Sequence, residues 1–351
     1  MSPLVPVFVL SGFLGSGKTT LLNAVLKAPD FANTAVIVNE FGEIGLDHLL
    51  VERSSDNVVL LESGCLCCTI ADSLHETLAD LNFRKLRGEI PAFERVIIET
   101  TGLADPAPIL NTLLGNRLVT DHYRLDALIV TVDAQNAIAG LAAYAEVAKQ
   151  IAVADRLVVT KLDLVDSAAK LMSRLAQLNP GALLLESRDR RAALAAFAAG
   201  DRHLRLGAFA PPGSGNHAHV HGQEHAPDIN RHDAHIRAHC FVVQDAASWA
   251  GIAAWWHLVS ELYGDRLLRC KGLLRIADTG EIVFLQGVQR VFHRPERMRD
   301  WPDADHRSRL VCIGRDLDNA QLQLSLEALQ LPPGSNPNLS LADLQLKRSQ
   351  A

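Results

Sequence analysis

Eight residues near the start of the chain have the types and the spacing of a phosphate-binding loop. The segment from Gly12 to Thr19 reads GFLGSGKT and matches the pattern G-x-x-x-x-G-K-[ST] in full. Glycines let backbone N–H groups close around phosphate oxygens, and a following helix adds the positive end of its dipole. Lys18 would reach the β- and γ-phosphates of a nucleotide, and the Thr19 hydroxyl would bind Mg²⁺. The predicted nucleotide contacts are Gly12, Gly15, Ser16, Gly17, Lys18, Thr19 and Thr20.

A second segment delivers an acid to the end of an apolar run. Glu99 follows Val96-Ile-Ile, and Gly102 comes three residues later. The carboxyl end of a parallel strand is where the Mg²⁺ shell or the attacking water of a nucleotide hydrolase lies. We therefore predict Lys18, Thr19 and Glu99 as catalytic residues, with the Gly102 N–H facing the γ-phosphate.

The segment Thr160-Lys161-Leu162-Asp163 is the candidate for recognition of the base. Small GTPases carry N-K-x-D at such a strand end, and here Thr160 replaces the first residue. A carboxylate at Asp163 accepts hydrogen bonds from guanine N1 and N2, which adenine cannot offer. Thr160, Lys161 and Asp163 thus favour GTP. An ordinary strand-end loop with a Lys–Asp pair is the alternative.

Three cysteines, Cys65, Cys67 and Cys68, crowd into four positions of a chain that has only six. Closely spaced thiolates are soft ligands for Zn²⁺, Cu(I) or, less often, Co²⁺. Three of them leave a tetrahedral Zn²⁺ one ligand short, which suits a site that gives its metal away. A redox-active thiol group and buried structural cysteines are the alternatives.

The cysteine segment lies between two stretches that a P-loop GTPase reorders when the γ-phosphate leaves, residues 39–47 and the Glu99 strand. Acidic and imidazole side chains near these stretches would complete the two metal sites. The predicted additional ligands of the transferred metal are Glu40, Glu43 and His122, and Asp47 is predicted to touch Mg²⁺.

Seven of the chain's 14 histidines lie in residues 217–239. Neutral imidazole binds Zn²⁺, Cu²⁺ and Ni²⁺ readily, so the segment has the composition of a metal buffer. A solvated linker of biased composition is the alternative.

The spacing of apolar residues predicts the scaffold for these segments. Short apolar runs alternate with helical patterns over the first 200 residues, which predicts an α/β P-loop NTPase fold: a mainly parallel sheet with helices on both faces. The predicted strands are 4–10, 34–39, 57–61, 95–99, 127–132, 157–160 and 182–185, and the predicted helices are 19–26, 70–86 and 134–151.

A second, smaller domain is predicted to be α+β. We place the P-loop domain at residues 1–208, a His-rich linker at 209–236, the second domain at 237–331 and a tail at 332–351. Its predicted strands are 238–243, 272–277, 281–291 and 310–313, with a hairpin turn at 278–280 and helices at 249–262 and 320–329. Cys240, Cys270 and Cys312 are predicted to be core residues.

Composition excludes several classes of protein. The chain has 351 residues, 48% of them hydrophobic and 21% charged, with a net charge of −6, which indicates a globular protein and argues against phosphate-neutralising nucleic-acid binding. No stretch reaches 18 apolar residues without charge, so we expect no membrane span. Six cysteines are too few for a disulfide scaffold, which favours the cytoplasm.

Taken together, these motifs resemble those of the CobW-type metallochaperone GTPases, relatives of the nickel-insertion GTPases that serve urease and hydrogenase. The matching segments are Gly12–Thr20, Asn39–Gly42, Gly64–Cys68, Glu99–Gly102 with Asp105-Pro106, and Thr160–Asp163. The resemblance covers the whole chain, because the family also carries a His-rich linker and a small C-terminal domain. It implies GTP hydrolysis coupled to handing zinc or cobalt to a client, with Cys65, Cys67 and Cys68 as ligands of the transferred metal.

The predicted function is therefore a cytoplasmic GTPase that uses GTP, Mg²⁺ and Zn²⁺, or Co²⁺ in place of Zn²⁺, and delivers metal to a client protein in a nucleotide-gated manner. No arginine finger is evident in cis, so we expect slow intrinsic turnover that a client or a homo-oligomer accelerates. The alternatives are a P-loop kinase with a structural zinc and a non-catalytic His-rich metal store.

Overall fold

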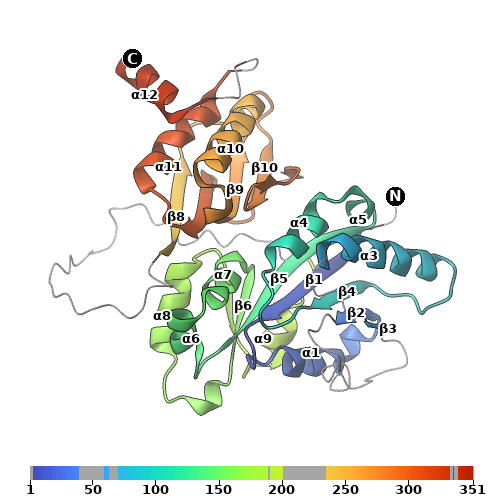
Figure 1. Cartoon of the computed structure of the whole chain (residues 1–351). Coiled ribbons are helices and arrows are strands. Elements are labelled where there is room, and N and C mark those ends of the chain that lie inside the picture. Colours follow the sequence, from blue (N-terminus) through green and yellow to red (C-terminus); the bar gives the residue numbers. More distant parts are fainter. Residues whose placement is uncertain are drawn as a thin grey trace. The chain divides into compact units, whose positions relative to one another are not determined.

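The computed structural model describes residues 3–38, 59–62, 70–188, 190–200, 235–332, 335 and 339–350. Its described part divides into two compact units (Figure 1). The first, blue to green, comprises the described residues up to 200 except 177–181; the second, yellow to red, begins at residue 235 and includes 177–181. None of the described helices is long and apolar enough to cross a membrane.

The first unit is built on a parallel sheet of seven strands in the order β3-β2-β4-β1-β5-β6-β7. Because all strands point the same way, their carboxyl ends form one edge, where ligands bind in open α/β sheets. The predicted parallel α/β sheet is confirmed. The strands are β1 (Val5–Gly12), β2 (Thr34–Val38), β3 (Val59–Glu62), β4 (Arg95–Glu99), β5 (Tyr123–Asp133), β6 (Arg156–Thr160) and β7 (Leu183–Glu186).

Helices cover both faces of this sheet (Figure 1), because its central strands are apolar on both sides. Phe8 and Leu10 of β1 belong to a buried cluster with α1 and α9, and the alternating Val7 and Val9, also fully buried, point to the other face. The helices are α1 (Lys18–Leu26), α3 (Ile70–Leu86), α4 (Ala107–Gly115), α5 (Arg117–Thr120), α6 (Ala137–Ala143), α7 (Ala145–Val153), α8 (Ala169–Leu178) and α9 (Arg190–Ala195), with 3₁₀ turns at Pro29–Phe31 and Leu162–Leu164.

Several predicted ends in this unit are shifted by one or two residues, and two differences are larger. The helix predicted at 134–151 is two helices, because Tyr144 has an extended backbone and its ring packs 4.8 Å from that of Phe13. Strand β5 starts four residues before the predicted 127, at Tyr123, which is buried and donates its hydroxyl hydrogen bond to the Leu78 carbonyl of α3.

The second unit contains an antiparallel sheet in the order β11-β10-β9-β13-β8, with β12 paired to β10. Its strands are β8 (Ile236–Val243), β9 (Leu267–Arg275), β10 (Ile282–Val288), β11 (Val291–Phe292), β12 (Glu296–Met298) and β13 (Ser308–Arg315). The helices are α10 (Trp249–Tyr263), α11 (Asn319–Ser325) and α12 (Leu341–Gln350), with 3₁₀ turns at Gly264–Arg266 and Leu326–Gln330. The α+β prediction and the turn between β9 and β10 are confirmed.

The predicted role of the single cysteines is right for two of three. Cys270 of β9 and Cys312 of β13 are free cysteines that lie opposite each other on adjacent strands, and both are buried in the core cluster of this unit. Cys240 is exposed, so its assignment to the core is wrong. Side chains alternate along β8, and Cys240 stands on the side opposite its buried neighbour Phe241.

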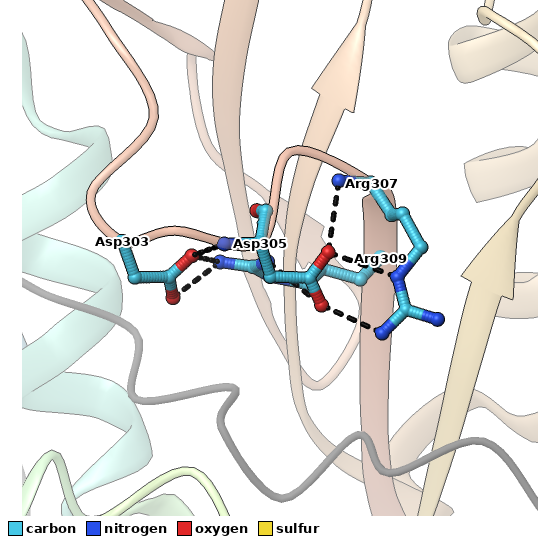
Figure 2. Close-up of polar contacts among 4 residues, drawn as sticks. All are labelled: Asp303, Asp305, Arg307 and Arg309. Carbon is cyan, nitrogen blue, oxygen red and sulfur yellow. Dashed lines mark hydrogen bonds and ion pairs between the residues drawn. The ribbon is translucent and has the colours of Figure 1, made fainter.

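A fully buried guanidinium organises the loop before β13 (Figure 2). Arg309 donates to both carboxylate oxygens of Asp303, at 2.7 and 2.6 Å, and to the backbone carbonyl of Asp305. Arg307 in turn donates to the two oxygens of Asp305 at 2.9 and 2.7 Å. Burial of this arginine is tolerated because two carboxylates and a backbone carbonyl take up both of its terminal nitrogens. Ion pairs and hydrogen bonds from Arg309 thus hold the loop against strand β13.

This network predicts a pH dependence of stability. Hydrogen bonds from Arg307 outweigh partial burial and lower the pKa of Asp305 to about 2, below its ordinary value of 3.8. The ionised form is stabilised in the fold, so its contribution is complete above about pH 4 and is lost as the pH falls through about 2. The variant Asp305→Asn should melt below wild type above about pH 4, and the gap should close toward about pH 2. Asp245→Asn, at an exposed carboxylate, is the control; a gap that stays constant with pH would contradict this account.

Candidate functional site

The loop between β1 and α1 needs glycine at the positions where the sequence has it. Gly12, Gly15 and Gly17 have positive φ angles of 140°, 69° and 92°. A Cβ atom on Gly12 would overlap the Thr131 side chain and lie 2.6 Å from the Thr131 carbonyl and 2.7 Å from Ser16 Oγ. Larger residues are therefore excluded from Gly12 by space as well as by backbone conformation.

Neighbouring strands brace this loop through hydroxyl groups. Ser16 Oγ lies 2.6 Å from Thr131 Oγ1 of β5, and Thr160 of β6 donates its hydroxyl hydrogen bond to the Ser16 carbonyl at 2.7 Å. Thr160 is 6% exposed, and its hydroxyl oxygen also lies 3.3 Å from the Val132 carbonyl, which shares the same hydrogen. The structure therefore gives Thr160, predicted as a nucleotide contact, a bracing role behind the loop.

Lys18, Thr19 and Glu99 are brought together at the carboxyl edge of the sheet. Lys18 is 9% exposed, and its ammonium donates to the carbonyls of Gly12 at 2.9 Å and Phe13 at 3.3 Å. The Thr19 hydroxyl donates to Glu99 Oε1 at 2.9 Å, and Glu99 is 2% exposed. A hydroxyl and a buried carboxylate are hard oxygen donors, which fits a Mg²⁺ ion carried by a nucleotide.

Gly102 packs against the backbone of the phosphate loop. A Cβ atom on Gly102 would lie 2.7 Å from the Leu14 nitrogen and 2.8 Å from the Leu14 Cα. The glycine begins a turn that is closed by a hydrogen bond from the Ala104 N–H to the Thr101 carbonyl, at 3.2 Å. The predicted γ-phosphate contact therefore touches the loop that would hold the phosphates.

A cavity of about 490 Å³ extends from the loop to the predicted base-recognition segment. Gly17 and Thr20 lie at its start, and Lys161 and Asp163 line it further along. Ser187 and Arg188 also line it; the sequence reasoning missed them, although they follow β7 at the same edge as the other loops. The size and lining suit a purine nucleoside next to a phosphate loop.

Lys161 has a left-handed backbone, with φ at 54°, and forms an ion pair with Asp133 at 2.8 Å. Burial raises the pKa of the Asp133 carboxyl, but hydrogen bonds from Lys161 and Asn136 outweigh that effect, and the pKa is lowered overall. The ion pair fixes the lysine stem, which forms part of the cavity wall beside Asp163.

His122 is placed away from these residues. It directly precedes β5, and its carbonyl accepts from the Val5 N–H at 2.9 Å, at the amino end of β1. The eight-residue β1 spans roughly 25 Å to the phosphate loop at its other end. The structure thus puts His122 and the Thr19–Glu99 pair at opposite edges of the sheet.

The remaining predicted ligands, Cys65, Cys67, Cys68, Glu40, Glu43 and Asp47, lie outside the described residues. So does the His-rich segment, apart from its last five residues, 235–239. Within the part of the chain that the structure describes, no three His, Cys, Asp or Glu side chains are grouped as a metal site requires.

Comparison with known proteins identifies the family. Residues 6–186 match the model described as "CobW/HypB/UreG, nucleotide-binding domain", and residues 236–330 match "Cobalamin synthesis protein cobW C-terminal domain". The chain is 32% identical to the zinc chaperone YjiA of Escherichia coli over 94% of this chain and 100% of that protein. It is 28% identical to the zinc-regulated GTPase metalloprotein activator 1 of Schizosaccharomyces pombe, over 89% of this chain and 83% of that protein.

The fold agrees with this assignment. The crystal structure of Zn(II)-bound YjiA GTPase from E. coli superposes with a TM-score of 0.64 at 28% identity, covering 94% of this chain and 100% of that one. The phosphate loop and its acidic partner Glu99 are also in place. Because both family models and a relative matched over its full length agree, we conclude that this chain belongs to the CobW/HypB/UreG family.

Proposed function

We propose that this chain is a GTPase that couples GTP binding and hydrolysis to the carriage of a zinc ion and its transfer to a client protein. The observation that carries the proposal is the hydrogen bond from Thr19 to the buried Glu99 beside Lys18 in a complete phosphate loop. Relatives named as zinc chaperones and as a zinc-regulated GTPase match most of this chain, which supports zinc as the cargo.

The hydrolytic step relies mainly on positioning and charge. The oxygen of a water molecule attacks the γ-phosphorus, and the bond from that phosphorus to the β–γ bridging oxygen breaks, so that GDP leaves with the electron pair. A proton of the water passes to a γ-phosphate oxygen, which gives inorganic phosphate. Lys18 neutralises charge that builds on the leaving oxygens, and the Gly102 N–H donates a hydrogen bond to a γ-phosphate oxygen. Thr19 and Glu99 would hold Mg²⁺, which supplies further neutralisation of the phosphates when bound.

The zinc ligands in this proposal are the thiolates of Cys65, Cys67 and Cys68. Three thiolates and one further ligand make a tetrahedral zinc site. Among the predicted candidates, His122 belongs to the opposite edge of the sheet from the nucleotide loops, so we favour Glu40 or Glu43 as the fourth ligand. Asp47 remains the proposed additional contact to Mg²⁺, and Co²⁺ is the second candidate cargo.

The proposal also assigns a role to each domain of the chain. In this proposal the domain of residues 1–208 binds nucleotide, the linker of residues 209–236 connects the domains, and the domain of residues 237–331 contacts the client. A reducing compartment such as the cytoplasm keeps the thiols available for zinc. A client, or a second copy of the chain, accelerates a slow intrinsic turnover.

A zinc titration against a competing chelator tests this function. It is run with a non-hydrolysable GTP analogue and Mg²⁺, with GDP and Mg²⁺, and without nucleotide. We expect zinc affinity to differ at least about tenfold between the two nucleotides, or about 1.4 kcal/mol of coupling. The same coupling must change nucleotide affinity when zinc is added, because linkage is reciprocal.

The background protein carries Asn at the five histidines between residues 217 and 232, which removes competing imidazoles. His235 and His239 are kept, because residues 236–243 form β8. Replacement of Cys65, Cys67 and Cys68 by serine should abolish the coupled site, and Cys240→Ser, at an exposed cysteine of the second unit, should leave it intact. Equal zinc affinity in all three nucleotide states would reject nucleotide gating.

A further inference from the structure

A buried glutamine holds the turn that follows the Glu99 strand. Gln150 of α7 is 1% exposed, and its side-chain amide nitrogen donates to the Gly102 carbonyl and to the Ala104 carbonyl, each at 3.1 Å. One amide nitrogen therefore bonds two carbonyls of one three-residue turn. The next residue back on α7, Lys149, forms an ion pair with Asp105 at 3.7 Å.

These bonds orient the peptide groups on both sides of Gly102. The Thr101 carbonyl accepts from the Ala104 N–H at 3.2 Å, and the Gly102 carbonyl accepts from Gln150. In a trans peptide the N–H points away from the C=O. With both carbonyls committed to the protein, the direction of the Gly102 N–H is set by the turn and by Gln150.

The turn cannot take up a different position freely, because Gly102 packs on the Leu14 backbone. On its other side, α7 forms a wall of a second cavity of about 470 Å³, lined mostly by apolar groups and including Phe13, Leu14 and Gln150. Loss of the Gln150 amide would leave two carbonyls of the turn without this donor, at a buried position.

We propose that Gln150 is a positioning residue for the GTPase reaction, which aligns the Gly102 N–H with the γ-phosphate and so sets the preference for GTP over GDP. This inference rests on the proposed function, because it requires that Gly102 contacts the γ-phosphate. GDP has no γ-phosphate, so its affinity does not depend on the alignment of this turn.

The test compares Gln150→Leu and Gln150→Glu, which keep the size of the side chain and remove its N–H donors. Gln286→Leu, at a buried glutamine of the second unit, controls for the chemical change. Three quantities are measured: the affinities for a non-hydrolysable GTP analogue and for GDP, the rate of single-turnover GTP hydrolysis, and the melting temperature. We expect both Gln150 variants to bind the analogue about tenfold more weakly, to bind GDP within about twofold of wild type and to hydrolyse GTP about tenfold more slowly.

Each result decides between defined accounts. The inference is wrong, and the residue is structural, if the Gln150 variants keep the wild-type ratio of analogue to GDP affinity. The same holds if the affinities for both nucleotides fall equally while the melting temperature also falls. If wild type itself neither prefers the analogue nor hydrolyses GTP, the proposed function fails first. If Gln150→Leu does not fold, the same measurements on Gln150→Glu decide the question.

Discussion

Replacing Lys18 by methionine is expected to slow GTP hydrolysis by about 100- to 1,000-fold, the usual effect of removing one group that stabilises transition-state charge. The Lys18 ammonium lies inside the loop, bonded to the carbonyls of Gly12 and Phe13, where the phosphates of a nucleotide would meet it. Methionine retains the length of the side chain and removes the charge. The loop should survive, because Ser16 stays bonded to Thr131 and Thr160.

A steady-state phosphate-release assay measures this effect, with melting curves to show that the variant folds. Lys85→Met is the matched control, since Lys85 also donates to a backbone carbonyl, that of Phe93 at 2.9 Å, but is outside the site. Wild-type hydrolysis by the Lys18 variant would contradict the proposed mechanism. Unchanged metal carriage in cells by a hydrolysis-deficient variant would instead favour the non-catalytic metal store.

Local sequence pattern was enough to predict the scaffold and the phosphate loop. Strand β4 at Arg95–Glu99 and helix α3 at Ile70–Leu86 have the predicted ends, because apolar runs of strand length and helical periodicity are properties of neighbouring residues. The same holds for the phosphate loop, whose glycines, lysine and threonine act within eight positions. A buried parallel strand also needs no knowledge of its partners to be recognised.

Features that depend on distant partners could not be predicted in this way. Thr160 braces Ser16 from 144 positions away, and Gln150 reaches Gly102 across 48 positions. Ser187 and Arg188 belong to the base cavity only because β7 is the seventh strand of the sheet. A single sequence contains the residue types of these pairs but not their contacts. The motif at 160–163 therefore predicts Thr160 as a nucleotide contact, which agrees with its place in the cavity lining, but not its bond to Ser16, and it does not single out Gln150.

The base-recognition prediction has the second-largest expected effect. Asp163 lines the cavity that starts at Gly17 and Thr20, with its carboxylate as the acceptor proposed for guanine N1–H and the 2-amino group. In the variant Asp163→Asn an amide replaces the carboxylate, so one acceptor becomes an N–H donor that faces the donors of guanine. We expect GTP affinity to fall about 100-fold, because hydrogen bonds to a charged acceptor are among the strongest in proteins.

The same variant should gain affinity for xanthosine triphosphate, because xanthine has a carbonyl in place of the 2-amino group and that oxygen accepts from the new amide. Competition of GTP, ATP and xanthosine triphosphate for one fluorescent nucleotide measures all three affinities. Asp166→Asn, at an exposed acid three residues further on, should leave them unchanged. A variant that loses affinity for GTP and gains affinity for xanthosine triphosphate identifies Asp163 as the residue that recognises the base. The threonine at position 160 does not prevent this, because its hydroxyl is bonded to the Ser16 carbonyl of the loop. Wild-type preference for ATP, unaffected by Asp163→Asn, would place base recognition elsewhere and favour the kinase alternative.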